Sequence, residues 1–146
     1  MALKQSNMAQ LRETTPSGYV SGARMVGIAT YTVAQAFTAA SDKLELAVLP
    51  ADARLVSAEL IGVGVGAITA TMGLMSGEVG ASDNARTVGN QLLAAVSIND
   101  TAAKATTLAC LNIAPSNVHR SIGVTLSGNV AAGSAKKITL VLEYVF

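Results

Sequence analysis

The amino-acid sequence predicts an all-β protein, an antiparallel β-sandwich of about eight strands with an extended N-terminal arm. Apolar and polar residues alternate with a period of two in several segments, as they do in strands with one buried face. Gly, Pro, Asn and Asp interrupt these segments at short intervals. No long alternation of strand and helix patterns exists, which argues against a parallel sheet. A jelly roll is one arrangement that the pattern allows.

The first eighteen residues differ from the rest of the chain. Residues 1–18 are polar, lack a hydrophobic period and end in Thr-Thr-Pro-Ser-Gly. We expect an arm here, followed by a single β-sandwich domain over residues 19–146, since 146 residues fit one ordinary domain. Two interpretations of the arm remain open: a disordered tail, or a segment that lies on a neighbouring subunit.

The strands of the first half are expected over 19–33, 37–50 and 53–64. The first is rich in β-branched residues. In the second, apolar residues alternate with Lys43, Glu45 and Ala47, which predicts one solvent-exposed face and one buried face. Pro50 ends that strand because proline cannot donate to a ladder.

Residues 60–77 form a stretch of eighteen residues without a charge, close to the length of a membrane span. Its internal pattern does not suit a helix, because Gly62, Gly64 and Gly66 recur at every second position. Each glycine costs a helix about 1 kcal/mol relative to alanine. We therefore predict two strands joined as a hairpin by a turn near 64–67, the second over 67–76, and no membrane span.

The second half begins with the largest expected loop, over residues 77–91, which is rich in Gly, Asp and Asn. The short apolar runs 92–100 and 106–114 fit a strand or a helix, and their Val, Ile and Thr residues favour strands. A further strand is expected from 119. The last strand, 138–146, is apolar on nearly both faces, so it should be central in a sheet or pressed against another chain.

The composition suggests partner chains. Charged residues make up 13% of the chain and hydrophobic residues 51%, so part of the exterior should be buried against neighbours. The net charge of +1 and the lack of a basic stripe give no support to nucleic-acid binding.

No catalytic constellation is found. The single histidine, His119, stands beside Arg120, a cation that does not help an imidazole act as a base. The single cysteine, Cys110, has apolar neighbours and is expected in the core. Glu78 and Asp83 do not have the spacing of a calcium loop. We expect no catalytic, cofactor-binding or metal-binding residues, and a protein that is not an enzyme.

Three stretches resemble small virion proteins of tailed bacteriophages: KLELAVLPADARLVSAELIGVG, TATMGLMSGEVGASDNA and RSIGVTLSGNVAAGSAKKITLVLEYV. The resemblance covers residues 19–146. It includes a Leu-Pro-x-x-x-Arg turn from Leu49 to Arg54 and a final β-branched strand with Glu143 and Tyr144 near its end. Among these proteins the chain is most similar to capsid decoration (cement) proteins.

The resemblance implies a non-enzymatic protein that binds the outside of a phage capsid and stabilises it by bridging major capsid subunits. It further implies a homotrimer, assembled in the host cytoplasm and located on the capsid exterior, without cofactor, nucleic acid or membrane. The residues that we expect at interfaces are Lys4, Arg12, Glu13, Tyr144 and Phe146.

Two alternatives remain open: another structural β protein of a phage tail or head fibre, or a carbohydrate- or receptor-binding β domain. The small number of aromatic residues, 3% of the chain, weighs against a sugar site.

Overall fold

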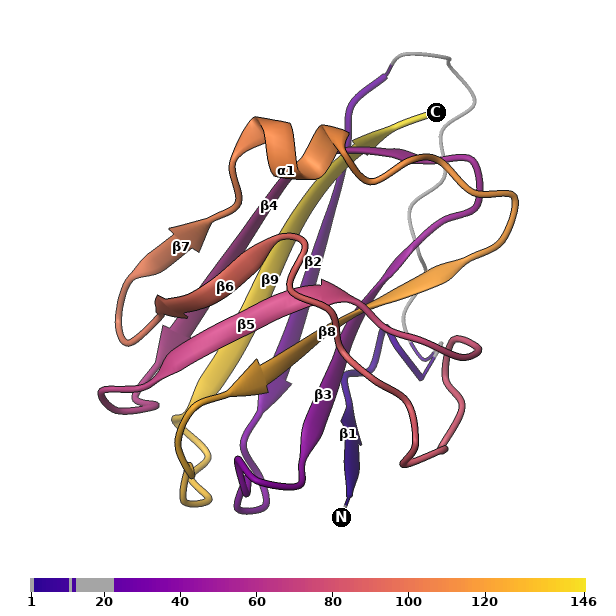
Figure 1. The fold of residues 1–146 in the computed structure, drawn as a ribbon. Helices are drawn as coiled ribbons and strands as arrows, with labels where there is room; N and C mark the ends of the chain where they lie inside the picture. Colours follow the sequence, from indigo (N-terminus) through magenta and orange to yellow (C-terminus); the bar gives the residue numbers. More distant parts are fainter. Residues whose placement is uncertain (1, 11, 13–22) are drawn as a thin grey trace.

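A computed structural model describes residues 2–10, 12 and 23–146 of the chain. In these residues, nine strands form two sheets that face each other, and there is one short helix (Figure 1). In chain order the elements are β1 (Leu3–Gln5), β2 (Met25–Thr32), β3 (Lys43–Leu49), β4 (Arg54–Val63), β5 (Thr69–Leu74), β6 (Leu93–Ser97), β7 (Ala102–Lys104), α1 (Thr107–Leu111), β8 (Arg120–Leu126) and β9 (Lys137–Val145).

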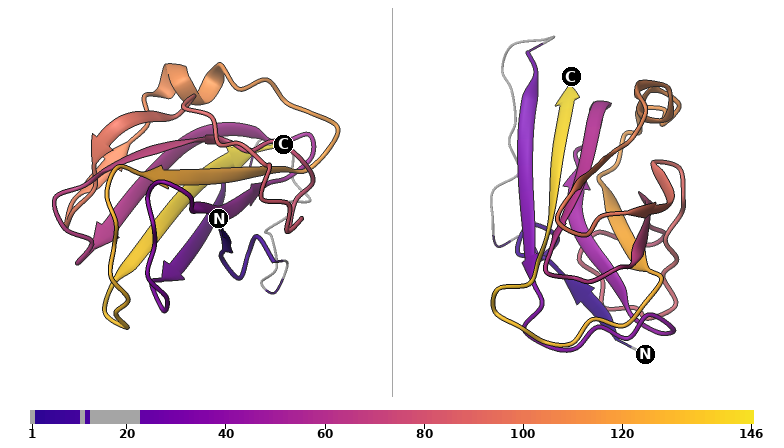
Figure 2. Two further views of the ribbon diagram at one scale, coloured as in Figure 1. Left: turned by 60° about the horizontal axis from the view of Figure 1, so that its bottom comes forward. Right: turned by 90° about the vertical axis from the view of Figure 1, so that its left-hand side faces the viewer.

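The strands are divided between a five-stranded sheet A, in the order β1-β3-β8-β5-β6, and a four-stranded sheet B, in the order β2-β9-β4-β7. Figure 2 shows the two layers edge-on. Every neighbouring pair is antiparallel except β1 and β3, which run parallel. The predicted antiparallel β-sandwich is confirmed.

The strand order is that of a jelly roll. Strands of the first half pair with those of the second half in reverse order: β2 with β9, β3 with β8, β4 with β7 and β5 with β6. Such pairing is what results when one long hairpin is folded across itself into two sheets. The short strand β1 is added at the edge of sheet A.

The core lies between the inner faces of the two sheets. It consists mainly of aliphatic side chains from β3, β4, β8 and β9, with Phe37 and Tyr144 as its large rings. In β9 the side chains at 138, 140, 142 and 144 are buried and those between them are partly exposed. Burying one such side chain contributes about 1.5–3 kcal/mol. The prediction that the last strand is central is confirmed, because β9 lies between β2 and β4.

The predicted hairpin over residues 60–77 is wrong, although both of its strands exist. β4 belongs to sheet B and β5 to sheet A, so the connection crosses from one sheet to the other. Gly64 and Gly66 have φ values of +66° and +88°, which glycine adopts at little cost. These two residues let the chain change direction between the sheets.

The predicted strand over 106–114 is also wrong, since its central part is the helix α1. The hydroxyl of Thr106 accepts a hydrogen bond from the amide of Ala109 at 3.1 Å and caps the first turn. Cys110 is the buried residue of this helix. By contrast, the loop predicted over 77–91 is confirmed, and its one bridge joins Val88 to Met75.

The first residues of the chain lie against the domain. Leu3–Gln5 pair with Lys43–Glu45, and Met8 and Ala9 are buried. Residues 13–22 lie outside the described part, so the division of the chain at residue 18 stays a prediction. None of the described helices is long and apolar enough to cross a membrane.

Candidate interaction surfaces

A buried polar cluster joins three distant segments on the outer side of sheet A. The guanidinium of Arg86 contacts the carboxylate of Glu45 at 3.0 and 3.1 Å, and both side chains are almost fully buried. Arg86 also donates to the hydroxyl of Ser121 at 2.9 Å and to the carbonyl oxygens of Ser76 and Ala81 at 2.7 and 3.1 Å. This one side chain therefore holds the 77–91 loop against the sheet.

Glu45 connects the same cluster to the N-terminal segment, since it accepts hydrogen bonds from the Gln5 side chain and the Gly80 amide. Burial acts to raise the pKa of Glu45. The hydrogen bonds from Arg86, Gly80, Ser121 and Gln5 outweigh burial, and the pKa lies below its ordinary value. Since its donors are occupied within the chain, the cluster is structural.

The three charged residues expected at an interface have different locations. Lys4, in β1, lies 3.9 Å from the carboxylate of Asp42. Arg12 is exposed and lines a polar hollow of about 270 Å³ beside Thr30 and Thr32 of β2. Glu13 lies outside the described residues. Contact of these residues with a partner stays a prediction.

The two aromatic residues expected at an interface are neighbours at the end of β9. Their ring centroids are 5.8 Å apart and the rings are nearly perpendicular. Tyr144 is 1% exposed and belongs to the core, whereas Phe146 is 37% exposed. Burial raises the pKa of Tyr144. Of the pair, only Phe146 reaches the surface, and its contact with a partner also stays a prediction.

One apolar surface lies on the outer side of sheet B, beside polar side chains such as Thr30 and Thr139. The strands β2, β9 and β4 lie side by side there, with Ile28 opposite Val141 and Val141 opposite Glu59. We call this surface the sheet-B face and define it by the outward side chains Val26, Ile28, Ile61, Val63 and Val141. An exposed ion pair between Arg24 and Glu143, 3.1 Å apart, lies at one end of it.

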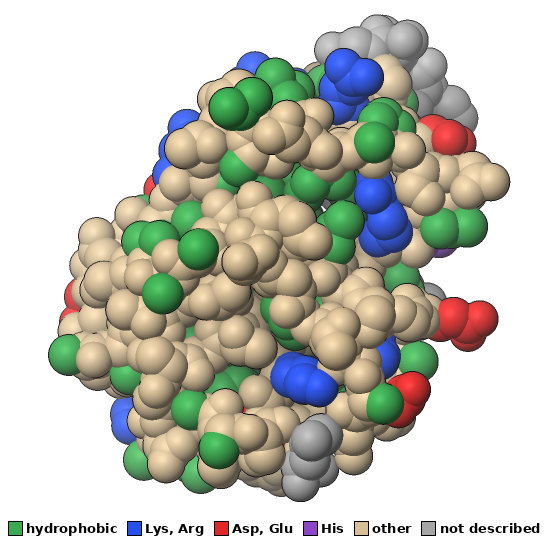
Figure 3. All heavy atoms as spheres, viewed as in Figure 1, with side chains coloured by type: hydrophobic (Ala, Val, Ile, Leu, Met, Phe, Trp, Pro, Cys, Tyr) green, Lys and Arg blue, Asp and Glu red, His purple; other side chains and the backbone are tan. Residues whose placement is uncertain are grey.

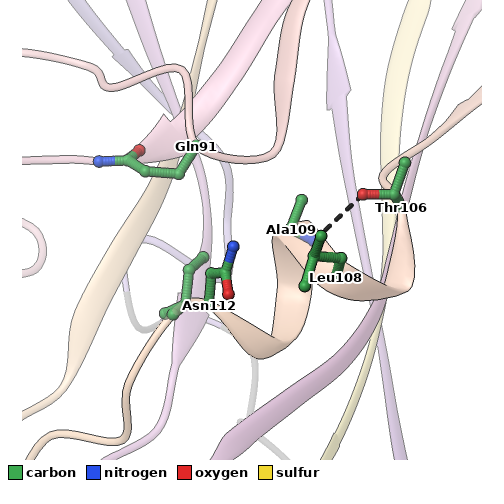
Figure 4. Close-up of a pocket in the computed structure, with 6 residues that line it drawn as sticks. Gln91, Thr106, Leu108, Ala109 and Asn112 are labelled. Carbon is green, nitrogen blue, oxygen red and sulfur yellow. Dashed lines mark hydrogen bonds between the residues drawn. The ribbon is translucent and has the colours of Figure 1, made fainter.

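A second apolar surface surrounds α1. We call it the α1 surface and define it by Leu108, Leu111 and the adjoining hollow of about 350 Å³. Leu108 is 69% exposed although it is a large apolar residue. Figure 4 shows Gln91 on one side of this hollow and α1 on the other. In Figure 3, hydrophobic side chains are visible over α1 and charged ones are sparse on this face.

The described residues offer little for catalysis. No group of three or more His, Cys, Asp or Glu side chains in residues 2–10, 12 and 23–146 could hold a metal ion. Nδ1 of His119 accepts a hydrogen bond from the Ala51 amide at 3.0 Å. The imidazole therefore holds the turn between β3 and β4 in place. Cys110 is buried, as predicted.

No family model matches the chain, and neither does any curated protein. Solved structures do match. A chain from the capsid of Ralstonia phage GP4 is 36% identical with a TM-score of 0.88, and the match covers 99% of this chain and 97% of that one.

Two more distant matches share the fold. A chain of the capsid asymmetric unit of cyanophage Pam1 is 18% identical with a TM-score of 0.58, over 94% of this chain and 95% of that one. A chain of the acid-stable capsid of Helicobacter pylori bacteriophage KHP30 is 12% identical with a TM-score of 0.52, over 87% and 90%.

The jelly roll is a fold of viral capsid proteins, among others, and exposed apolar surfaces are typical of proteins that contact other chains. The match to the capsid of Ralstonia phage GP4 places the chain among the capsid proteins. The chain belongs to a family of phage capsid proteins and is a phage virion structural protein.

Two features of these surfaces lie beyond sequence reasoning. The outward direction of Val26 and Ile28 follows from the pairing of β2 with β9, more than a hundred residues away in the sequence. Leu108 and Leu111 lie three residues apart, as on one helix face, but five residues are too few for a helical period to be recognised.

Proposed function

We propose that the chain is a decoration protein that binds the outside of a phage capsid and bridges its major capsid subunits. The observation that carries the proposal is the 36% identity, over almost the full length of both chains, to a chain of the Ralstonia phage GP4 capsid. The small size of the chain and its low charge support the same function.

The two apolar surfaces support a bridging role. The sheet-B face lies on β2, β4 and β9, and the α1 surface lies on α1 and the residues beside it, so different neighbours can cover them. Contact at two places makes the total binding far stronger than either contact alone. The exposed Leu108 and Ile28 then lose contact with water on assembly.

We further propose that the protein is a homotrimer both in solution and on the shell. A closed ring of three copies needs a contact in which two different patches of the same chain meet. Phe146, 37% exposed at the end of β9, lies outside both apolar surfaces and can supply one of these patches, so the two surfaces stay available to the shell. Sedimentation of the purified protein tests this state, and a single monomeric species at all concentrations would contradict it.

The proposed function is tested with purified capsid shells of the same phage assembled without this chain. We expect the added protein to co-sediment with the shells in a saturable number of copies and to raise their melting temperature. Leu108→Lys places a charge on the α1 surface and should weaken binding at least tenfold. Ala135→Lys, in the exposed loop between β8 and β9, is the matched control. Shells that stay bare with the wild-type protein would contradict the proposal, as would shell formation by this chain alone.

A further inference from the structure

The edge strand β2 differs from the other edge strands of the two sheets. Exposed edges can pair with other chains, and proteins prevent this with short strands, bulges, charges or prolines. β1 and β7 have only three residues each. β6 has an irregular register with β5, and Ala95 within it has a φ of 52°.

In the described part of the chain, β2 shows none of these protections. It is eight residues long, its sequence MVGIATYT contains no charge and no proline, and its register with β9 is continuous over all eight pairs. Among the described residues it pairs with β9 alone. A long, regular, uncharged edge strand of this kind is suited to strand addition by another chain.

The backbone groups that face the free edge can be assigned. In an antiparallel ladder, residues alternate between those bonded to the partner strand and those whose N–H and C=O point away from it. The amide of Val33 donates to the carbonyl of Lys136 at 2.9 Å, which places the odd-numbered residues of β2 on the β9 side. Val26, Ile28 and Thr30 therefore direct their N–H and C=O groups to the free edge.

The outward side chains at this edge are apolar in the first half of β2 and polar in the second half. Val26 is 48% exposed and Ile28 59% exposed, both on the sheet-B face. At the other end of β2, Thr30 and Thr32 border the polar hollow that Arg12 also lines. A strand that fits this edge is uncharged beside Val26 and Ile28 and carries a carboxylate beside Arg12.

A second copy of the chain is the other candidate for this edge. Antiparallel self-pairing centred on Ile28 would bring residue 24 of one copy opposite residue 32 of the other. Arg24 is already paired with Glu143 at 3.1 Å, so its charge does not oppose this arrangement. The two occupants differ in one outcome: only self-pairing makes the free protein a dimer.

We propose that the free edge of β2 takes up an extended strand of a capsid shell subunit, uncharged over most of its length and with an acidic residue next to Arg12. The added strand is held by the backbone groups of Val26, Ile28 and Thr30, and its carboxylate pairs with the guanidinium of Arg12. This inference rests on the proposed function and specifies how the chain is held.

The test compares Ile28→Pro with Ile28→Thr in shell binding. Proline removes the N–H that points to the free edge, is accepted at such edge positions and leaves the bonds to β9 in place. Threonine keeps the N–H and a β-branched side chain. We expect Ile28→Pro to weaken binding at least roughly tenfold, through the lost hydrogen bond and the blocked strand, and Ile28→Thr to bind within a few-fold of wild type. Melting temperatures of both free variants control for folding.

Hydrogen exchange of the wild-type protein provides a readout without substitution. The amides of Val26, Ile28 and Thr30 should exchange quickly in the free protein and slowly on the shell. Those of Gly27, Ala29 and Tyr31 should be protected in both states, because they bond to β9. Unchanged exchange at the three edge amides would overturn the inference.

The remaining outcomes separate the two proposals. Wild-type protein that does not bind shells contradicts the proposed function itself. Wild-type protein that binds, together with Ile28→Pro that binds equally well, overturns only the edge-strand inference. Equal loss in both variants assigns the contact to the Ile28 side chain and likewise overturns backbone pairing. A wild-type dimer that Ile28→Pro converts to a monomer assigns the edge to a second copy. If Arg12→Glu binds shells as well as wild type does, the partner strand has no carboxylate in contact with Arg12.

Discussion

Gly73 of β5 and Gly123 of β8 are direct cross-strand partners. A Cβ on Gly73 would lie 2.5 Å from the backbone of Gly89, and a Cβ on Gly123 would lie 3.0 Å from Val88 and still closer to the Met75 side chain. The two missing side chains therefore create the space in which Met75 and the end of the 77–91 loop lie on sheet A. The loop reaches the buried Arg86 cluster because this space exists.

Gly73→Ala should lower the free energy of unfolding by about 1–3 kcal/mol, because the added methyl group meets backbone that cannot move easily. Gly27→Ala is the matched control. Its Cβ would lie 3.9 Å from Met8 and Tyr144, which is ordinary van der Waals contact. Because alanine has fewer backbone conformations than glycine in the unfolded chain, this variant should be more stable than wild type by about 0.4–1 kcal/mol. Urea denaturation measures both, and equal stability of the two variants would contradict the close approach.

Glu45→Gln should destabilise the protein by about 3–5 kcal/mol, because it leaves the buried guanidinium of Arg86 without its counter-charge. Glu78→Gln changes an exposed carboxylate of the same loop and should shift stability by less than about 0.5 kcal/mol. Urea denaturation measures both variants. A Glu45→Gln protein as stable as wild type would show that the ion pair does not hold the loop.

The stability of the protein should fall as the pH falls below about 4.5. The pKa values of both Glu45 and Asp42 are lowered in the folded protein. In each case burial acts to raise the pKa, and hydrogen bonds outweigh it. A carboxyl with a lowered pKa contributes stability above its unfolded-state pKa and loses it as the pH falls through the folded value. Melting temperatures between pH 7 and 3 check this, and Glu45→Gln should show a shallower decline.

Arg120→Met should leave the free protein as stable as wild type or more stable, by about 1 kcal/mol. Nε and Nη2 of Arg120 are buried and donate to no partner among the described residues, and burial lowers the pKa of this guanidinium. Methionine keeps the apolar stem without the unpaired groups. Arg54→Met, at an exposed position, is the control. A loss of more than about 1 kcal/mol in Arg120→Met alone would show that the guanidinium is stabilising.

Local patterns predicted strands well and their partners poorly. The many apolar residues of β9 indicated a central strand, and β9 does lie between β2 and β4, although only one of its faces is buried and the other is partly exposed. The glycines of 60–77 indicated strands, but a period of two does not say in which sheet a strand lies. The five-residue connection from Val63 to Thr69 therefore read as a hairpin turn, although it crosses between sheets.

The short helix was missed for a local reason. α1 has five residues, so its apolar positions do not repeat often enough to show a helical period. The available signal was Thr106, a favourable N-cap residue three positions before Ala109, whose amide it accepts.

The candidate surfaces were predicted only in part. The composition indicated that apolar exterior meets other chains, but the residues that form it depend on long-range pairing. Arg12 lines a hollow beside β2, whereas Tyr144 turned out to be buried in the core. The position of β2 at the end of sheet B depends on long-range strand pairing, which the sequence MVGIATYT does not reveal.

The most direct test of the central claim is labelling of intact, DNA-filled virions with an antibody against this chain, viewed by electron microscopy. We predict regular labelling over the whole head surface. Labelling confined to the tail or to head fibres, or no labelling of particles that contain the chain, would contradict a decoration protein on the capsid exterior.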